Sequence, residues 1–235
     1  MTYENLRKFA YSNDQLIKGK VKGIVLQFNG LGNKNFYKNH LPEGQEYADD
    51  DIIFVIPYYN PWCWMNEEAV SYVDEIVDLL CEKYGLGDNA KIVSTGGSMG
   101  GLSALTYCAY AKRTPVSCVA NCPVCDLPYH FTERDDLPRT LYSAFAHFEG
   151  SIDEALESRS PLHLAKAEKM PKIPYRVFHC IDDAAVNISA HSERFIEALG
   201  DGYDVEFVKI PHRSHTDLSP EAAYLYRKAI LDSLK

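Results

Sequence analysis

Short apolar runs alternate with longer amphipathic segments along most of the chain. Runs of the length and composition of buried strands cover residues 23–28, 51–56, 91–95, 116–120, 175–180 and 205–210. Apolar positions with helical spacing mark residues 67–84, 102–109, 189–199 and 221–234. The polar residues 1–22 alternate weakly, which predicts one or two edge strands. Strands that alternate with helices predict an α/β protein, with a mainly parallel sheet covered by helices on both faces.

One segment interrupts this alternation. Residues 126–170 contain three prolines, Pro128, Pro138 and Pro161, and Pro171 follows directly. The segment shows only two short helical stretches, 141–148 and 152–157. Long irregular insertions in compact domains are usually functional. We therefore expect residues 1–235 to form a single domain in which 126–170 is a small cap, or lid, over the mouth of the site.

The net charge and the cysteine content limit which binding partners and which cellular location are expected. The net charge is −9 and the basic residues form no cluster, so nucleic acid and anionic membrane surfaces are poor partners. No apolar run approaches the roughly 18–20 residues that span a bilayer, and residues 1–15 lack the apolar core of a signal peptide. The seven cysteines are an odd number, which favours reduced thiols and a cytoplasmic location.

Residues that could take part in catalysis or binding lie at the carboxyl ends of the predicted strands. They are Asn29 and Gly30, the aromatic loop 57–66, Ser98, Asp126, Asp183 and His215. Parallel sheets bind ligands at this edge, because all of these strand ends meet there. Tyr58, Trp62 and Trp64 from the aromatic loop should line the substrate pocket, which predicts a partly aromatic wall.

The most informative motif is the junction at residues 96–100, which fits G-x-S-x-G. A strand precedes it and a helix-like run follows, so the chain is expected to turn sharply with Ser98 at the apex. Gly96 and Gly100 lack Cβ atoms, which lets strand and helix approach closely around the serine. A plain glycine–serine loop is the alternative, but the strand and helix on either side favour a nucleophilic Ser98.

A serine nucleophile needs a base, and the base needs a group that orients it. The chain supplies Ser98, then an aspartate pair after one strand, then two histidines after the last strand. This order resembles the α/β-hydrolase family. Residues 160–186 are similar to the acid-bearing segment of its prolyl-oligopeptidase-like and small-esterase branches, which usually reads H-G-x-x-D-x-x-V, with Cys180 here in place of the glycine.

The resemblance implies roles for further residues. It implies Asp183 as the catalytic acid, with Asp182 and Asp126 as alternatives. It implies His215 as the base, and His212, which directly follows the strand end, is the alternative. The oxyanion hole should use the backbone N–H of Met99 and a second N–H from Gly30 or Leu31. No cofactor and no metal are implied.

Cys122 and Cys125 form a C-x-x-C pair that could bind metal, together with His212 and His215, or act as a redox pair. A zinc site usually has a second close pair of ligands, and buried thiols are common beside apolar runs. We therefore expect no metal site.

The expected protein is a cytoplasmic serine hydrolase, and a carboxylesterase that acts on a small-molecule ester is favoured. One alternative is a serine peptidase of the prolyl-oligopeptidase-like type, although such peptidases usually carry an additional domain for which this chain has no room. The other alternative is a ligand-binding member of the fold without catalysis, because a fold alone does not establish turnover.

Overall fold

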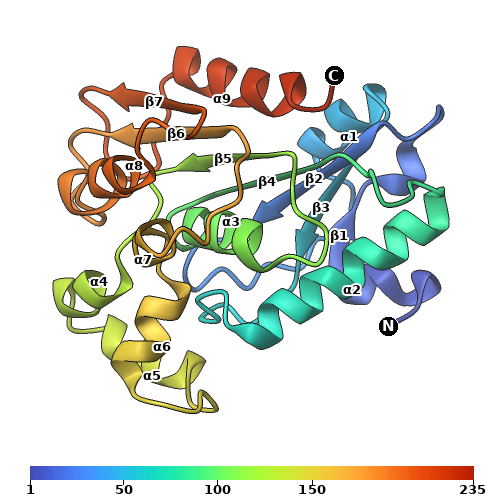
Figure 1. The fold of residues 1–235 in the computed structure, drawn as a ribbon. Helices are drawn as coiled ribbons and strands as arrows, with labels where there is room; N and C mark the ends of the chain where they lie inside the picture. Colours follow the sequence, from blue (N-terminus) through green and yellow to red (C-terminus); the bar gives the residue numbers. More distant parts are fainter.

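The computed structural model describes all 235 residues and is built on a single seven-stranded sheet (Figure 1). Its strands lie in the order β1-β3-β2-β4-β5-β6-β7, and every neighbouring pair is parallel except β1 with β3. The strands are β1 (Ala10–Ser12), β2 (Gly23–Phe28), β3 (Ile52–Pro57), β4 (Ile92–Gly97), β5 (Ser117–Asn121), β6 (Tyr175–Cys180) and β7 (Val205–Ile210). The mainly parallel sheet and the N-terminal edge strand are confirmed.

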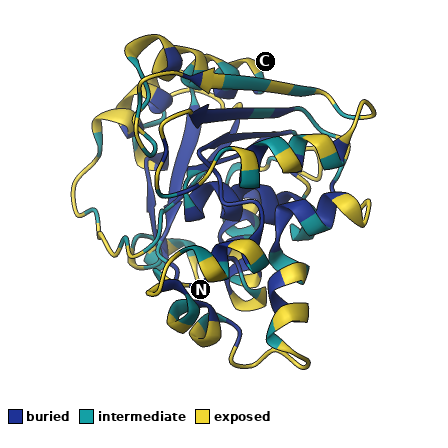
Figure 2. Cartoon of the chain, turned by 90° about the vertical axis from the view of Figure 1, so that its left-hand side faces the viewer, coloured by how far each residue is buried: buried dark blue, intermediate teal, exposed yellow.

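Helices cover both faces of the sheet, as predicted. The helices α1 (Pro42–Asp49) and α9 (Pro220–Asp232) pack with one set of strand side chains, which includes Val25, Val93 and Val119. The opposite face packs against α2 (Glu67–Tyr84), α3 (Met99–Tyr110) and α8 (Arg194–Leu199). Strands β1 to β6 are almost wholly buried between these layers, whereas the edge strand β7 is largely half-buried or exposed (Figure 2). None of the helices is both long and apolar enough to cross a membrane.

The sequence of α2 shows why a helix forms at this position. The Asn66 side chain accepts a hydrogen bond from the Ala69 amide at 3.0 Å, which caps the first turn. Gly85, at φ 62°, ends the helix in the left-handed conformation that favours glycine. Between them, one buried stripe recurs every three or four residues and consists of Val70, Val73, Ile76, Val77, Leu80 and Cys81.

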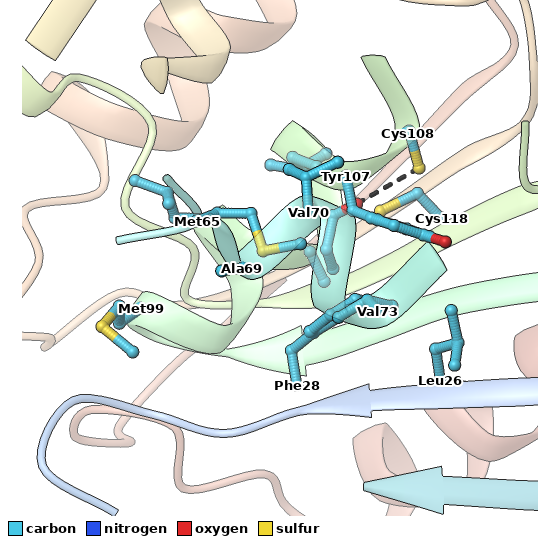
Figure 3. Close-up of a cluster of buried hydrophobic side chains, with 14 of the residues drawn as sticks. Leu26, Phe28, Met65, Ala69, Val70, Val73, Met99, Tyr107, Cys108 and Cys118 are labelled. Carbon is cyan, nitrogen blue, oxygen red and sulfur yellow. Dashed lines mark hydrogen bonds between the residues drawn. The ribbon is translucent and has the colours of Figure 1, made fainter. Parts of the chain in front are cut away.

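A buried cluster between β2, α2 and α3 fixes the start of α3 (Figure 3). Leu26 and Phe28 of β2 face the side chains of α2 and α3, and Met99 lies beside them with no exposed surface. Complete burial of such a side chain contributes about 1.5–3 kcal/mol. The residue that follows Ser98 is therefore anchored in the core, which restricts how the serine can move.

Residues 126–170 form four helices between β5 and β6, where the sequence predicted two. They are α4 (Leu127–Glu133), α5 (Leu137–Ala144), α6 (Ile152–Arg159) and α7 (Pro161–Lys166). Three of them carry proline in the first turn, a position that proline tolerates, so the prolines begin helices here rather than interrupt them. Helices α4, α5 and α6 project away from the sheet (Figure 1). That this segment covers the mouth of the site stays a prediction.

Candidate active site

Ser98 stands at a sharp turn between β4 and α3. Its backbone has φ 60° and ψ −126°, a conformation that residues other than glycine rarely adopt. A Cβ atom at Gly96 would lie 2.4 Å from the Gly100 oxygen, and one at Gly100 would lie 2.3 Å from the Phe28 oxygen. Only glycines allow the three segments to meet this closely, so the junction has the geometry that the G-x-S-x-G pattern predicts.

Asp183 and His215 meet beside this turn although they come from different strand ends. The Asp183 side chain is fully buried, and its Oδ2 atom lies 2.7 Å from His215 Nδ1. The amides of Ala185 and Val186 each donate to Asp183 Oδ1 at 2.9 Å. Burial alone would raise the pKa of Asp183, but hydrogen bonds from His179, His215 and the Val186 amide outweigh it and hold that pKa well below its ordinary value.

The ionised Asp183 determines which nitrogen of His215 carries the proton. A carboxylate can only accept hydrogen bonds, so His215 Nδ1 must hold the hydrogen. The lone pair is then on Nε2. The His215 side chain is 28% exposed, so the ring reaches the edge of the site while its Nδ1 remains tied to a buried group.

A second histidine supports Asp183 from within the protein. The His179 side chain is fully buried, and its Nε2 atom lies 2.9 Å from the Val186 oxygen and 3.5 Å from Asp183 Oδ2. His179 Nδ1 lies 2.7 Å from Ser192 Oγ, so both nitrogens of the ring have partners. The sequence placed His179 in the acid-bearing motif but gave it no role.

Asn121, at the end of β5, joins the serine turn to the histidine loop. The Ser98 amide donates to the Asn121 oxygen at 3.0 Å, and Asn121 Nδ2 donates to the Thr216 oxygen at 3.1 Å. A Cβ atom at Gly97 would lie 3.3 Å from the Thr216 methyl carbon, so the loop rests directly on the turn. Ser98 Oγ makes no hydrogen bond here, which is common before substrate binds.

Sequence reasoning missed Asn121. The only available signal was a polar side chain directly after a buried strand run, at the edge where ligands bind.

The predicted oxyanion residues also lie beside Ser98. Met99 opens α3, and the first amides of a helix have no partner within it. A Cβ atom at Gly30 would lie 4.0 Å from Ser98 Cβ, and the amides of Gly30 and Leu31 donate no hydrogen bond. The Asn29 amide donates to Tyr59 Oη at 2.7 Å, which fixes the base of this loop. Three free backbone donors therefore lie close to the serine.

These features can be compared with known proteins. The sequence model of the prolyl oligopeptidase family matches residues 65–232. The chain belongs to this family. Its fold is the α/β-hydrolase fold, and no curated protein matches it by sequence.

Solved structures of this fold include peptidases and esterases. Acylaminoacyl peptidase from Pyrococcus horikoshii is 16% identical with a TM-score of 0.71, covering 92% of this chain and 37% of its own. This member of the prolyl oligopeptidase family thus spans little more than a third of that peptidase. A thermophilic esterase from Thermogutta terrifontis is 17% identical (TM-score 0.68, 95% and 85% covered). S-formylglutathione hydrolase from Agrobacterium tumefaciens is 16% identical (TM-score 0.67, 92% and 84% covered).

The aromatic loop differs from the prediction at one residue. Trp64 is fully buried, and its indole N–H donates to Thr140 Oγ1 at 3.0 Å, so it joins α5 to the core and cannot line a pocket. The reason is its positive φ of 45°, which turns the chain inward after Trp62. Trp62 is 42% exposed, and Tyr58 lines a cleft beside the loop that contains Gly30.

The alternative acids and the alternative base are placed differently. Asp126 caps α4 by accepting from the Tyr129 amide at 3.1 Å and pairs with Arg194 at 2.7 Å. Asp182 and His212 face each other at 4.0 Å, with side chains 60% and 95% exposed. The structure thus brings Asp183 and His215, and none of these alternatives, to the serine turn.

The C-x-x-C pair is buried, and burial raises the pKa of both thiols. Cys122 Sγ lies within 4.8 Å of the ligand atoms of Asp183 and His215, whereas Cys125 belongs to no such group. A thiol that remains protonated is neither a good nucleophile nor a good metal ligand. The arrangement therefore gives no support to redox or zinc chemistry at this motif.

A second cluster, His130, Glu133 and His191, also brings potential metal ligands within 4.8 Å of one another. The amides of Cys125 and Asp126 both donate to His191 Nδ1 at 3.1 Å, so that nitrogen carries no proton. The hydrogen must be on His191 Nε2, which lies 2.9 Å from Glu133 Oε2. A metal would need that position free, so the cluster is better described as a link between α4 and the segment before α8.

Proposed function

We propose that this protein is a serine hydrolase that cleaves carboxylic esters through an acyl-enzyme on Ser98. The observation that carries the proposal is the buried Asp183 carboxylate bonded to His215 Nδ1, beside a serine held at φ 60°. A weak hydroxyl nucleophile requires this order of nucleophile, base and orienting acid.

In the first step, His215 Nε2 takes the proton of Ser98 Oγ as the oxygen attacks the ester carbonyl. Asp183 stays ionised because its pKa is well below the ordinary value, and it stabilises the imidazolium that forms. The carbonyl oxygen gains negative charge and is stabilised by the free amide of Met99 and that of Gly30 or Leu31.

In the second step, the imidazolium of His215 gives its proton to the leaving alcohol, and the bond to that alcohol breaks. Water then enters, His215 removes a proton from it, and the hydroxide attacks the acyl-enzyme. The acid is released and Ser98 regains its proton. These reaction steps require no cofactor and no metal ion.

Two kinds of substrate fit this chemistry. Esters are supported by the Thermogutta and Agrobacterium hydrolases, which match this chain over most of their own length. Amides of the peptidase type are the second candidate, because the family model is that of prolyl oligopeptidases. A panel of p-nitrophenyl esters measured against aminoacyl p-nitroanilides separates them, and we expect the esters to give the higher kcat/KM.

A fluorophosphonate probe tests the nucleophile itself. We expect covalent labelling of the wild-type protein at Ser98 and none of Ser98→Ala, with ester turnover of the variant reduced by several orders of magnitude. Unchanged circular dichroism and melting temperature would show that the variant is folded. A variant that kept more than about a tenth of the wild-type activity would exclude Ser98 as nucleophile. A protein that is neither labelled by the probe nor active on any ester of the panel would favour the non-catalytic alternative.

A further inference from the structure

A small cleft lies beside the candidate active site, between the segments that follow β2 and β3. Its volume is about 240 Å³, and Asn29, Phe36, Tyr58 and Asn60 are among the residues that line it. Pockets that enclose a whole small ligand usually measure about 300 Å³ or more. The cleft therefore has room for one group of a substrate rather than for all of it.

The position of the cleft relative to Ser98 follows from the loop that contains Gly30. Asn29 lines the cleft, and the next residue, Gly30, would place a Cβ atom 4.0 Å from Ser98 Cβ. A group held in the cleft is thus one residue along the backbone from the free amides of Gly30 and Leu31. The loop from Asn29 to Gly30 thus borders both the cleft and the serine turn.

The polar lining of the cleft offers hydrogen-bond donors and no carboxylate. Asn29 Oδ1 accepts from Asn33 Nδ2 at 3.2 Å and Asn60 Oδ1 accepts from the Trp62 amide at 2.9 Å, whereas the Nδ2 groups of Asn29 and Asn60 have no partner. The Lys34 ammonium group has no ion pair. In a chain with net charge −9, this lining suits a group that carries several acceptor oxygens.

The apolar part of the lining is a pair of aromatic rings. Phe36 is 68% exposed, and its ring centroid lies 4.7 Å from that of Tyr58. A single exposed phenylalanine is common, but here the ring borders a cleft to which four asparagines contribute side-chain amides. The flat C–H face of a sugar ring matches such a surface, since it can stack on an aromatic ring while its hydroxyls reach the amides.

The order of the strands determines which end of the ester enters the cleft. Asp183 and His215 follow β6 and β7, and the cleft follows β2 and β3, on the other side of β4. The leaving alcohol must receive its proton from His215, so it departs on the side of β6 and β7. The acyl group of the ester therefore lies on the other side of β4, where the cleft is.

We propose that the cleft binds the acyl part of the substrate and that this part is a sugar acid, esterified at its carboxyl group. The inference rests on the proposed function, because it assumes an acyl-enzyme on Ser98. It assigns the donors of Asn29, Asn60 and Lys34 to the ring hydroxyls and the Phe36 face to the ring itself.

Two matched methyl esters test the proposal. Methyl galacturonate and methyl cyclohexanecarboxylate both carry a six-membered ring next to the ester carbonyl, and they differ chiefly in the oxygens of that ring. We expect kcat/KM for the sugar ester to be at least about tenfold higher, as two or three hydrogen bonds would give. Equal rates, or a faster cyclohexane ester, would overturn the proposal. Preference for an O-acetylated sugar would also overturn it, because the sugar would then be the leaving group.

Variants of the lining locate the effect. Phe36→Ala and Asn60→Asp should each lower kcat/KM for the sugar ester about fivefold or more, and Asn60→Asp retains an oxygen that accepts from the Trp62 amide. The turnover of p-nitrophenyl acetate by each variant serves as its own reference rate, because this acyl group is too small to reach the cleft, and the effect is measured as the ratio of the two kcat/KM values. Tyr224→Ala is the matched control, because Tyr224 on α9 is 66% exposed and does not border the cleft.

The two proposals fail in different ways. A protein that Ser98 fluorophosphonate labelling and p-nitrophenyl acetate show to be active, but that does not prefer the sugar ester, would refute only the cleft assignment. A protein that shows neither labelling nor turnover of any ester would refute the proposed function itself. A preference that Phe36→Ala and Asn60→Asp leave intact would place the sugar elsewhere and overturn the assignment.

Discussion

Two aspartate–histidine pairs lie on the same two loops, and they differ in almost every physical respect. Asp183 is fully buried and lies 2.7 Å from His215, and two backbone amides hold its other oxygen. Asp182 and His212 are 60% and 95% exposed and lie 4.0 Å apart. The sequence offers both pairs with similar spacing, so only their surroundings distinguish them.

The difference shows what makes an ion pair useful for proton transfer. An exposed pair contributes roughly 0–1 kcal/mol, because water competes for both partners and the side chains remain mobile. A buried carboxylate with its own backbone donors is fixed before the reaction begins, and it fixes the histidine ring as well. Asp182 and His212 therefore carry the same functional groups as Asp183 and His215, but they are not held in place for proton transfer.

The largest expected difference between the two pairs concerns the histidines. His215→Ala should lower ester turnover by a factor on the order of 10³ or more, because the proposed base for Ser98 is then missing. His212→Ala should cost about tenfold or less, since that side chain faces solvent. Steady-state kinetics of the two purified variants checks this. The reverse pattern would mean that the triad must be rebuilt around His212.

The acids should differ in the same direction and by less. Asp183→Asn keeps the shape of the side chain but removes the charge that orients His215, so we expect kcat to fall by a factor on the order of 10³. Asp182→Asn should leave kcat within about twofold, because Asp182 is exposed and has only the weak contact with His212. If both variants lost activity equally, the buried pair would have no special role.

The link between the serine turn and the histidine loop should give a smaller effect. Asn121→Ala removes the donor to the Thr216 oxygen, so His215 should sample more positions, and we expect kcat to fall about tenfold with KM little changed. Asn89→Ala is a control for loss of an asparagine side chain, because Asn89 is exposed and precedes β4, at the end of that strand opposite Ser98. A merely structural role for Asn121 would lower the melting temperature without changing kcat of the folded protein.

The smallest expected effect is on stability and depends on pH. Since the folded-state pKa of Asp183 is lowered, its contribution to the free energy of unfolding is complete above the ordinary carboxyl pKa of about 4 and is lost as the pH falls through the folded value. The difference between wild type and Asp183→Asn should therefore be constant near pH 5–6 and shrink below about pH 4. Urea unfolding at several pH values measures it, with Asp182→Asn as the control for removing one surface charge.

The sequence predicted the sheet well because its strands are continuous apolar runs. The six parallel strands lie within two residues of their predicted bounds, and α2 begins and ends where its cap and glycine indicate. Helix α1 was missed, because Pro42–Asp49 is short and polar and its burial depends on β3 and on Tyr11. Only tertiary contacts decide such an element.

Candidate site residues could be predicted from the sequence when the end of a strand fixes their position. The sequence placed Ser98 in a recognised motif, and it placed Asp183 and His215 three and five residues after the ends of β6 and β7. Their catalytic roles stay predictions. The position of Trp64 could not be predicted, because its burial depends on a backbone turn and on Thr140 in a segment far along the chain. The contacts of Asn121 could not be predicted for a similar reason. Its partners are a backbone amide and a backbone oxygen, which every residue has, so the sequence does not identify them.

The order of the strands has a consequence for how the protein is made. The serine turn belongs to β4, whereas Asp183 and His215 follow β6 and β7, which are synthesised after β4 and β5. A nascent chain that has folded up to β5 contains Ser98 in its strained conformation but lacks Asp183 and His215. Such parallel pairing between distant segments is slow to form. The Asp183–His215 pair can therefore reach the serine turn only after β7 has been synthesised and has paired with β6.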